Sequence, residues 1–155
     1  MELSATRAMT IRRIEAGIFG NLTDIDTTIN PFEAGLGFCV NMDKVDFIGR
    51  KALVNKDKRT CLLGLTCKTE TPISGSKVIN GGKIVGHITA GVHSPTLNTG
   101  IGNVRFYEPN DWPGKSLDLK LPNGNLHKAE IVNLPFFDKK KHIVKGIDRT
   151  IPSRT

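Results

Sequence analysis

The second half of the chain alternates between apolar and polar residues with a period of two, and this pattern limits the fold more than any other feature. From Thr60 onward the alternation replaces a helical pattern and predicts six short strands within 75 residues. No helical period separates these strands, so the sequence predicts an antiparallel barrel or sandwich. The expected strands cover residues 60–68, 76–79, 83–90, 101–108, 116–121 and 126–134.

Two turn sequences support this reading of the strands. Asn80-Gly81-Gly82 suits a tight hairpin, because these residues tolerate the positive φ angles that such turns require. Pro122-Asn123-Gly124-Asn125 separates the last two strands. In the strand before it, Leu117, Leu119 and Leu121 alternate with polar residues, which indicates one buried face.

The cysteines indicate core positions and not a cross-linked framework. Cys39, Cys61 and Cys67 make an odd count without a Cys-x-x-Cys spacing, which argues against disulfides and against a structural zinc site. Cys61 and Cys67 share a strand face with Leu63 and Leu65, so we expect them in the core. This usage indicates a cytoplasmic or organelle-matrix setting.

Ahead of the strands the sequence is helical and rich in loops. Residues 2–16 predict a helix, and Gly17 stands where a left-handed terminator belongs. A second, short helix is expected from Asp46, as its cap, to Leu53. The chain therefore divides into a lead-in over residues 1–58, a β domain over residues 59–137 and a basic tail over residues 138–155.

Neither of two candidate cation sites has a complete ligand set. Residues 21–31 form a polar loop in which Asp24 and Asp26 lack the glycine and closing glutamate of a calcium loop, so turn chemistry is preferred. His87 and His93 lie six residues apart without a third ligand. The sequence predicts no metal site.

The charge of the chain concentrates at its end. The net charge is +7, and residues 138–155 contribute six bases against two acids. A polyanion partner is one interpretation, but no aromatic residue follows Phe137 to stack on bases. Nucleic acid is therefore not an expected partner, and a solvated tail is expected. No apolar run is long enough for a membrane span, and no secretory signal opens the chain.

Several short motifs together resemble one protein family. Two Glu-Ala-Gly triplets lie in the first 35 residues, and further motifs follow in the β domain. In combination they resemble the C-terminal part of the glycine cleavage T-protein family, the folate-dependent aminomethyltransferases. The motifs are Arg13-Ile14-Glu15-Ala16-Gly17, Asn30 to Gly37, Asp46-Phe47-Ile48-Gly49-Arg50, Gly86 to Gly91, Ser94 to Leu97 and Leu134-Pro135-Phe136-Phe137.

The resemblance implies a fold and four folate contacts. The fold is mainly β, a six-stranded antiparallel Greek-key-like barrel preceded by a helix and loop-rich segment from the end of an α+β domain. The implied contacts with tetrahydrofolate are Arg13, Phe19, Glu33 and Lys139. Phe19 stands where many relatives have tyrosine, and the three lysines from Lys139 leave the register of the last contact open.

The residues also allow structural roles at these positions. An arginine in the last turn of a helix interacts favourably with the negative end of the helix dipole, so Arg13 could have a purely structural role instead of a folate contact. Glu15 and Glu33 could each be an ion-pair or cap residue, and Phe19 could be a core residue. No catalytic residue is assigned.

The family's activity is transfer of a one-carbon unit to tetrahydrofolate from an aminomethyl group on a lipoyl carrier protein. In relatives the catalytic aspartate and a pterin-binding glutamate lie in a part that precedes this region, so we expect a C-terminal portion that contributes to the folate cavity and is inactive alone. One alternative is part of a folate-dependent demethylase of the dimethylsulfoniopropionate, dimethylglycine or sarcosine type. Another is a non-catalytic β-barrel module that self-associates or assembles with a partner.

Overall fold

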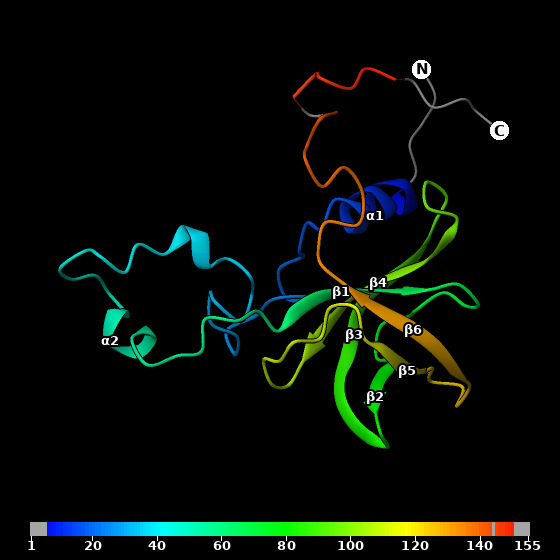
Figure 1. Ribbon diagram of the computed structural model, residues 1–155, viewed down its shortest axis with the longest axis horizontal. Coiled ribbons are helices and arrows are strands. Elements are labelled where there is room, and N and C mark those ends of the chain that lie inside the picture. The colour runs from blue at the N-terminus through cyan, green and yellow to red at the C-terminus, as the bar shows by residue number, and fades with distance from the viewer. Residues whose placement is uncertain (1–5, 144, 151–155) are drawn as a thin grey trace.

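The computed structural model describes residues 6–143 and 145–150 (Figure 1). Three helical elements come first, followed by six strands. The helical elements are α1 (Thr6–Glu15), the 3-10 turn η1 (Gly37–Cys39) and α2 (Arg50–Leu53). The strands are β1 (Leu62–Cys67), β2 (Lys77–Asn80), β3 (Lys83–Ser94), β4 (Thr99–Phe106), β5 (Ser116–Lys120) and β6 (Leu126–Val132). In the described part of the chain, no helix has the length and apolar character that crossing a membrane requires.

The six strands form a closed antiparallel barrel in the order β1-β4-β3-β2-β5-β6, with β6 pairing again with β1. β2, β3 and β4 follow one another as neighbours, and β1 lies beside β4, which is a Greek-key arrangement. Closure leaves no free sheet edge. The predicted fold, mainly β with six antiparallel strands behind a helix, is confirmed.

One continuous apolar core fills the barrel. Alternate residues of each strand point inward, as the period-two pattern predicts, and the central side chains of all six strands are buried. Phe106 and Trp112 stack in this core with ring centroids 4.5 Å apart. Cys61 and Cys67 are buried there beside Leu63 and Leu65, as expected. Burial raises the pKa of the Cys61 thiol to about 11, so this group stays protonated at neutral pH.

β3 continues four residues beyond its predicted end at residue 90. Gly91, the first residue after the predicted end, lies within the strand and pairs with Gly102 of β4. The backbone of residues 70–72 crosses directly over these glycines. A Cβ atom on Gly91 would lie 2.1 Å from the Pro72 carbonyl oxygen, and one on Gly100 would lie 2.2 Å from that of Glu70. Glycine is therefore needed for close backbone approach in mid-strand.

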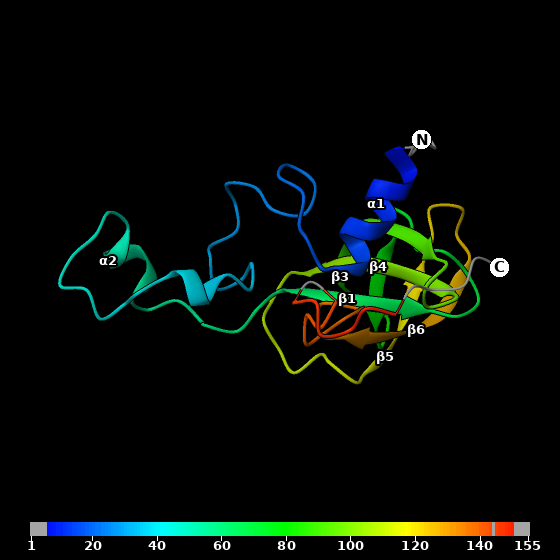
Figure 2. The same cartoon turned by 90° about the horizontal axis from the view of Figure 1, so that it is seen from above.

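Helix α1 lies across one end of the barrel (Figure 2). Its buried residue Ile14 packs with Ile101 of β4 and with Phe136, which follows β6. Phe136 in turn lies on Gly64, where an added Cβ would come within 2.7 Å of its ring. Gly17 follows two residues after the end of the helix at Glu15, and its φ of +64° confirms the predicted terminator. Residues 2–5 of the predicted helix lie outside the described residues.

A protruding arm, residues 37–58, extends away from the barrel in both ribbon views (Figures 1 and 2). Its helix α2 begins at Arg50, four residues after the predicted Asp46 cap. Gly49 is the N-cap and has a φ of +90°, a left-handed conformation in which the chain cannot already be helical, so the predicted cap was wrong. The Asp46 carboxylate instead accepts a hydrogen bond from the N–H of Phe47.

Candidate functional site

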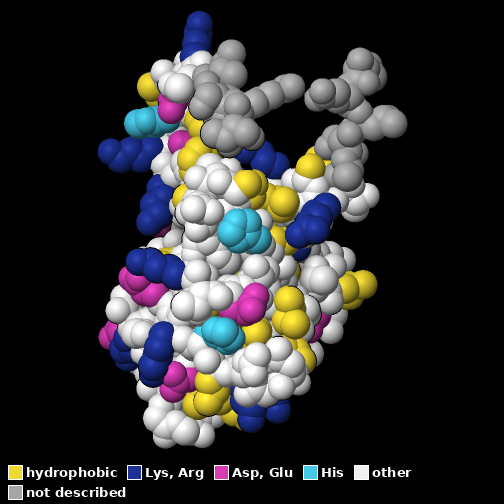
Figure 3. All heavy atoms as spheres, turned by 90° about the vertical axis from the view of Figure 1, so that its right-hand side faces the viewer, with side chains coloured by type: hydrophobic (Ala, Val, Ile, Leu, Met, Phe, Trp, Pro, Cys, Tyr) yellow, Lys and Arg dark blue, Asp and Glu magenta, His cyan; other side chains and the backbone are white. Residues whose placement is uncertain are grey.

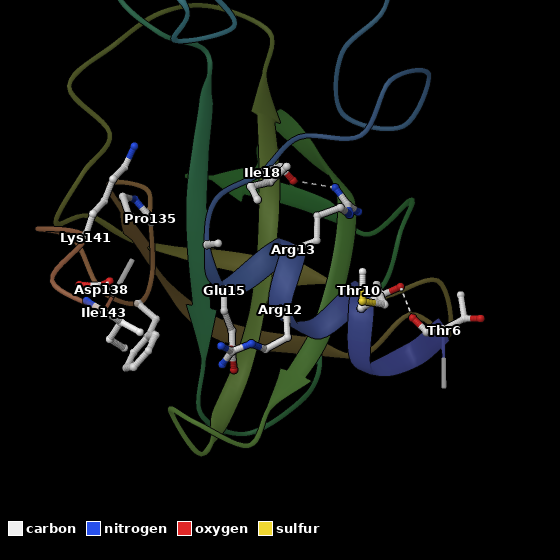
Figure 4. Close-up of a pocket in the computed structure, with 13 residues that line it drawn as sticks. Thr6, Thr10, Arg12, Arg13, Glu15, Ile18, Pro135, Asp138, Lys141 and Ile143 are labelled. Atoms are coloured by element: carbon white, nitrogen blue, oxygen red, sulfur yellow. Dashed lines mark hydrogen bonds and ion pairs between the residues drawn. The ribbon is translucent and has the colours of Figure 1, made fainter. Parts of the chain in front are cut away.

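A groove of about 720 Å³ separates α1 from the segment that follows the barrel. Figure 4 shows this groove from the side of α1, with residues 135–143, here called the C-terminal segment, forming the opposite wall. Its lining is mostly apolar, with a few charged side chains among it. The lining residues are Thr6, Met9, Thr10, Arg12, Arg13, Glu15, Ala16, Ile18, Pro135, Phe137, Asp138, Lys141 and Ile143.

Arg13 lines the groove but directs its guanidinium away from Glu15 (Figure 4). Its Nη1 atom donates to the carbonyl oxygen of Ile18 at 2.9 Å and to Asp24 Oδ2 at 2.7 Å. The Asp24 side chain is fully buried, while one quarter of the Arg13 side chain remains exposed. This ion pair with a buried carboxylate therefore holds the Arg13 guanidinium in place.

Asp24 is the centre of a buried polar network that sequence reasoning missed. Its Oδ2 also accepts the N–H of Gly20 at 2.7 Å, and its Oδ1 accepts the side chains of Thr89 on β3 and Asn103 on β4, the latter at 3.1 Å. Burial disfavours the charged form, but these hydrogen bonds outweigh it and hold the pKa of Asp24 below its ordinary value. The network fastens the loop after α1 to the barrel wall.

A second, more exposed contact attaches the same loop. Arg105 of β4 donates to Asp26 Oδ2 at 3.1 Å and to the Thr28 hydroxyl at 2.7 Å. Asp26 also accepts the N–H and hydroxyl of Thr28, and these hydrogen bonds lower its pKa. Turn chemistry was predicted for Asp24 and Asp26, and both have it. Asp24 pairs with Gly20 within the loop through its backbone N–H and its carboxylate, and it also anchors the loop to the barrel.

Glu15 joins three elements at the floor of the groove. The residue is 2% exposed, and its Oε1 accepts the hydroxyl of Ser94 on β3 at 2.6 Å. Its backbone carbonyl accepts the N–H of Phe137 at 3.0 Å, which ties the C-terminal segment to α1. Its Oε2 has no hydrogen-bond partner among the described residues. Arg12 Nη1 lies 3.8 Å from that oxygen.

The C-terminal segment is folded back by Asp138. The Asp138 carboxylate accepts the N–H groups of His142 at 2.7 Å and Ile143 at 3.0 Å. This turn brings Lys141 and Ile143 to the groove, whereas Lys139 is not among the residues that line it. Lys141 is therefore the lysine that lines the groove. The sequence left open which of the three consecutive lysines would do so.

Phe19 and Glu33, the other two predicted contacts, lie outside the groove lining and are half-buried. Glu33 belongs to a reciprocal capping box. The Asn30 side chain accepts the N–H of Glu33 at 3.1 Å, and the Glu33 carboxylate accepts the N–H of Asn30 at 3.1 Å. The Glu33 carbonyl accepts the N–H of Cys61 at 2.7 Å, so this turn also holds the start of the barrel.

The groove combines apolar walls with charged side chains of both signs, including the acidic Glu15 and Asp138. Apolar side chains from both walls can cover a flat aromatic body, while Arg12, Arg13 and Lys141 supply positive charge. Lysine and arginine side chains are spread over the face seen in Figure 3, and hydrophobic side chains show between them at several places along that face. The fold and the groove together define a β-barrel module with an attached helix.

Comparison with known proteins identifies the family. Residues 58–138, just over half of the chain, match the glycine cleavage T-protein C-terminal barrel domain. The chain therefore belongs to this family.

Similar proteins match over most of this chain and only part of their own length. The aminomethyltransferase of Streptomyces coelicolor is 34% identical over 142 residues, covering 83% of this chain and 37% of the relative. The aminomethyltransferase of Halothermothrix orenii is 36% identical over 130 residues, covering 80% of this chain and 36% of the relative. The crystal structure of the glycine cleavage system aminomethyltransferase T from Bartonella henselae matches with a TM-score of 0.74 and 25% identity. The match covers 85% of this chain and 38% of the Bartonella chain. The chain spans little more than a third of each.

Proposed function

We propose that this chain forms one wall of the folate cavity of an aminomethyltransferase-type one-carbon transferase. Residues 59–137 are the barrel domain, residues 1–58 the end of a preceding domain and connector, and residues 138–155 a basic tail. The observation that carries the proposal is the groove, in which Arg13 and the apolar walls meet. The resemblance implies that the whole enzyme takes an aminomethyl group from a lipoyl carrier protein and passes its carbon to tetrahydrofolate.

The groove matches folate in its chemistry. Folate joins a flat ring system to a tail of carboxylates, and the groove joins apolar walls to arginine and lysine side chains. Planar guanidinium groups suit carboxylates and polar ring edges because they offer several donors in one plane. Binding here is therefore expected to come from burial of the rings, with the cations orienting the tail.

We infer that turnover needs residues beyond this chain. The chain spans little more than a third of its relatives, and the resemblance places the family's catalytic aspartate in a part that it does not cover. None of the described groove residues has the position of a nucleophile and base in mutual hydrogen-bond reach. The wall of the cavity positions folate, and the chemistry is supplied elsewhere.

Calorimetric titration tests this proposal. We expect the chain to bind tetrahydrofolate weakly and to show no methylene transfer from a lipoyl-bound aminomethyl donor. Lys141→Ala should weaken binding by roughly threefold to fivefold, the size of an exposed ionic contact, while Lys83→Ala on the far hairpin should not. Lys139→Ala tests the contact predicted from sequence. Turnover by the chain alone, or no binding at millimolar ligand, would contradict the proposal.

The arm supports a second candidate function, assembly with a protein partner. Its apolar side chains stand in solvent although the barrel has a complete core of its own. Phe38 is 85% exposed, Val45 is 96% exposed and Ile48 is fully exposed. Apolar residues gathered on a projecting segment are typical of a surface that another protein covers.

Size-exclusion chromatography with light scattering tests assembly. We expect the chain to self-associate at tens of micromolar concentration, and the double variant Val45→Ser/Ile48→Ser to elute as a monomer because burial of these side chains drives association. Thr69→Ser, at an exposed position of the barrel, is the matched control. A monomeric wild-type chain that also captures no partner would count against this second function.

A further inference from the structure

We propose that Asn80 is a site of spontaneous chemical modification, at which the side-chain amide is converted to aspartate and isoaspartate. This inference does not depend on the proposed function. The chain has two Asn-Gly pairs, Asn80-Gly81 and Asn123-Gly124, and all four residues are exposed. Figure 1 shows the first pair at the tip of the β2–β3 hairpin, at the end of the barrel opposite α1. The two dipeptides are the same, so the fold decides which of them reacts.

The reaction needs a free backbone nitrogen directly after the asparagine. This nitrogen attacks the side-chain Cγ atom, a C–N bond forms, and the amide nitrogen leaves as ammonia. Water then opens the cyclic imide at one of its two carbonyls, which yields aspartate or isoaspartate without any further reactant. Glycine after the asparagine favours the attack, because it has no Cβ atom to block the approach and its backbone rotates easily. Both Asn-Gly pairs meet this requirement.

At Asn80 the reacting groups are free. Asn80 ends β2 and pairs with Lys83, and the two glycines between them form the turn with φ angles of +55° and +84°. Neither the Asn80 side chain nor the Gly81 N–H has a hydrogen-bond partner in the described part of the chain. A Cβ atom added to Gly81 or Gly82 would meet no described atom within 4 Å, so the imide ring has space to form.

At Asn123 both reacting groups are held. The Gly124 N–H donates to the carbonyl oxygen of Leu121 at 2.9 Å, so the attacking nitrogen is already engaged. The Asn123 Oδ1 atom accepts the N–H of Asn125 at 3.0 Å, which fixes the side chain along the turn. The Leu121 N–H donates to the Asn125 carbonyl oxygen at 2.9 Å and closes the same turn. Attack on Asn123 therefore requires two hydrogen bonds to break first.

Isoaspartate at position 80 would change one end of the barrel and leave the other intact. It routes the main chain through the former side chain and so adds a backbone atom to β2. The pairing of Ile79 with Ile84 and of Asn80 with Lys83 depends on regular strand spacing, so the hairpin should lose this register. None of these residues lines the groove, and the modification is expected to loosen the hairpin without altering the groove.

Peptide mapping by mass spectrometry tests the assignment on the folded chain, incubated in mildly alkaline buffer. We expect Asn80 to convert roughly tenfold faster than Asn123, the ratio that follows from breaking two ordinary hydrogen bonds at Asn123. In concentrated urea both turns are unfolded, and the two rates should agree within about threefold, because each asparagine then precedes an unconstrained glycine. Asn80→Gln should abolish the fast conversion, since the longer side chain must close a larger ring.

Asn123→Gln is the matched control, and it should leave the fast conversion at Asn80 unchanged. Conversion of Asn123 as fast as that of Asn80 in the folded chain would overturn the inference. A difference that persists in urea would also overturn it, because the flanking sequence and not the fold would then set the rates. An Asn80 that converts in urea but stays intact in the folded chain would show that the hairpin protects it, against the proposal.

Discussion

Replacing Asp24 by asparagine is expected to lower the free energy of unfolding by about 3 kcal/mol, the usual effect of removing one partner from a buried ion pair. Each oxygen of Asp24 accepts two donors, with Gly20 and Arg13 on Oδ2 and Thr89 and Asn103 on Oδ1. In asparagine an NH₂ group would replace one of these oxygens, and it would face two donors instead of accepting their hydrogen bonds. In a chain of this length the loss corresponds to roughly 6 to 12 °C in Tm, measurable by calorimetry.

Two measurements isolate this effect. Asp26→Asn lies in the same loop, but its carboxylate is exposed and contacts Arg105 at the surface, so its effect should be much smaller. Equal effects of the two variants would contradict the central role of Asp24.

Acid provides the second measurement. The pKa of Asp24 is lowered in the folded chain, so its stabilisation is present above the ordinary value of 3.8 and is lost as pH falls below it. Unfolding free energy should therefore depend less on pH between about 5 and 3 in Asp24→Asn than in wild type.

Gly91→Ala is expected to cost about 2 to 3 kcal/mol, the range for forcing an extra methyl group into a packed site. The new Cβ would lie 2.1 Å from the Pro72 carbonyl oxygen. A backbone carbonyl cannot rotate away as a flexible side chain can, so residues 70–72 would have to move off the barrel. Urea unfolding followed by tryptophan fluorescence measures the loss, because Trp112 lies in the barrel core.

Gly81→Ala separates the contact from the general effect of replacing a glycine. Gly81 has a φ of +55°, and a methyl group added there would have no described atom within 4 Å, so only backbone strain is expected. That strain costs about 1 kcal/mol. A smaller loss for Gly91→Ala than for Gly81→Ala would show that residues 70–72 yield freely and that the close approach is unimportant.

The strand pattern shows how much of the fold was predictable from local sequence. Inward side chains such as Leu117 and Leu119 alternate with polar neighbours, and a period of two is visible within a few residues. The turn at Gly81-Gly82 and the terminator at Gly17 were predictable for the same reason, since each depends on positive φ angles at glycine positions. Where the prediction failed, at the start of α2, two local signals competed and the left-handed Gly49 prevailed over the Asp46 cap.

The site was predictable only in part. The motif pointed to Arg13, and the groove does include it, but nothing near Arg13 in the sequence indicates Asp24 as its partner. The contacts of Asp24 with Thr89 and Asn103 join residues 65 and 79 positions apart. The three consecutive lysines likewise carry no register of their own, and the turn capped by Asp138 decides that Lys141 lines the groove.

The sequence by itself determined the barrel strands, their turns and the family resemblance, because periodicity, turn chemistry and short motifs are properties of neighbouring residues. The tertiary structure alone decided that Glu15 is buried with one oxygen unpaired among the described residues, and that α1 faces the C-terminal segment across a groove. Such features arise only when distant segments pack together, since burial and hydrogen-bond pairing depend on which side chains closure of the barrel brings into contact.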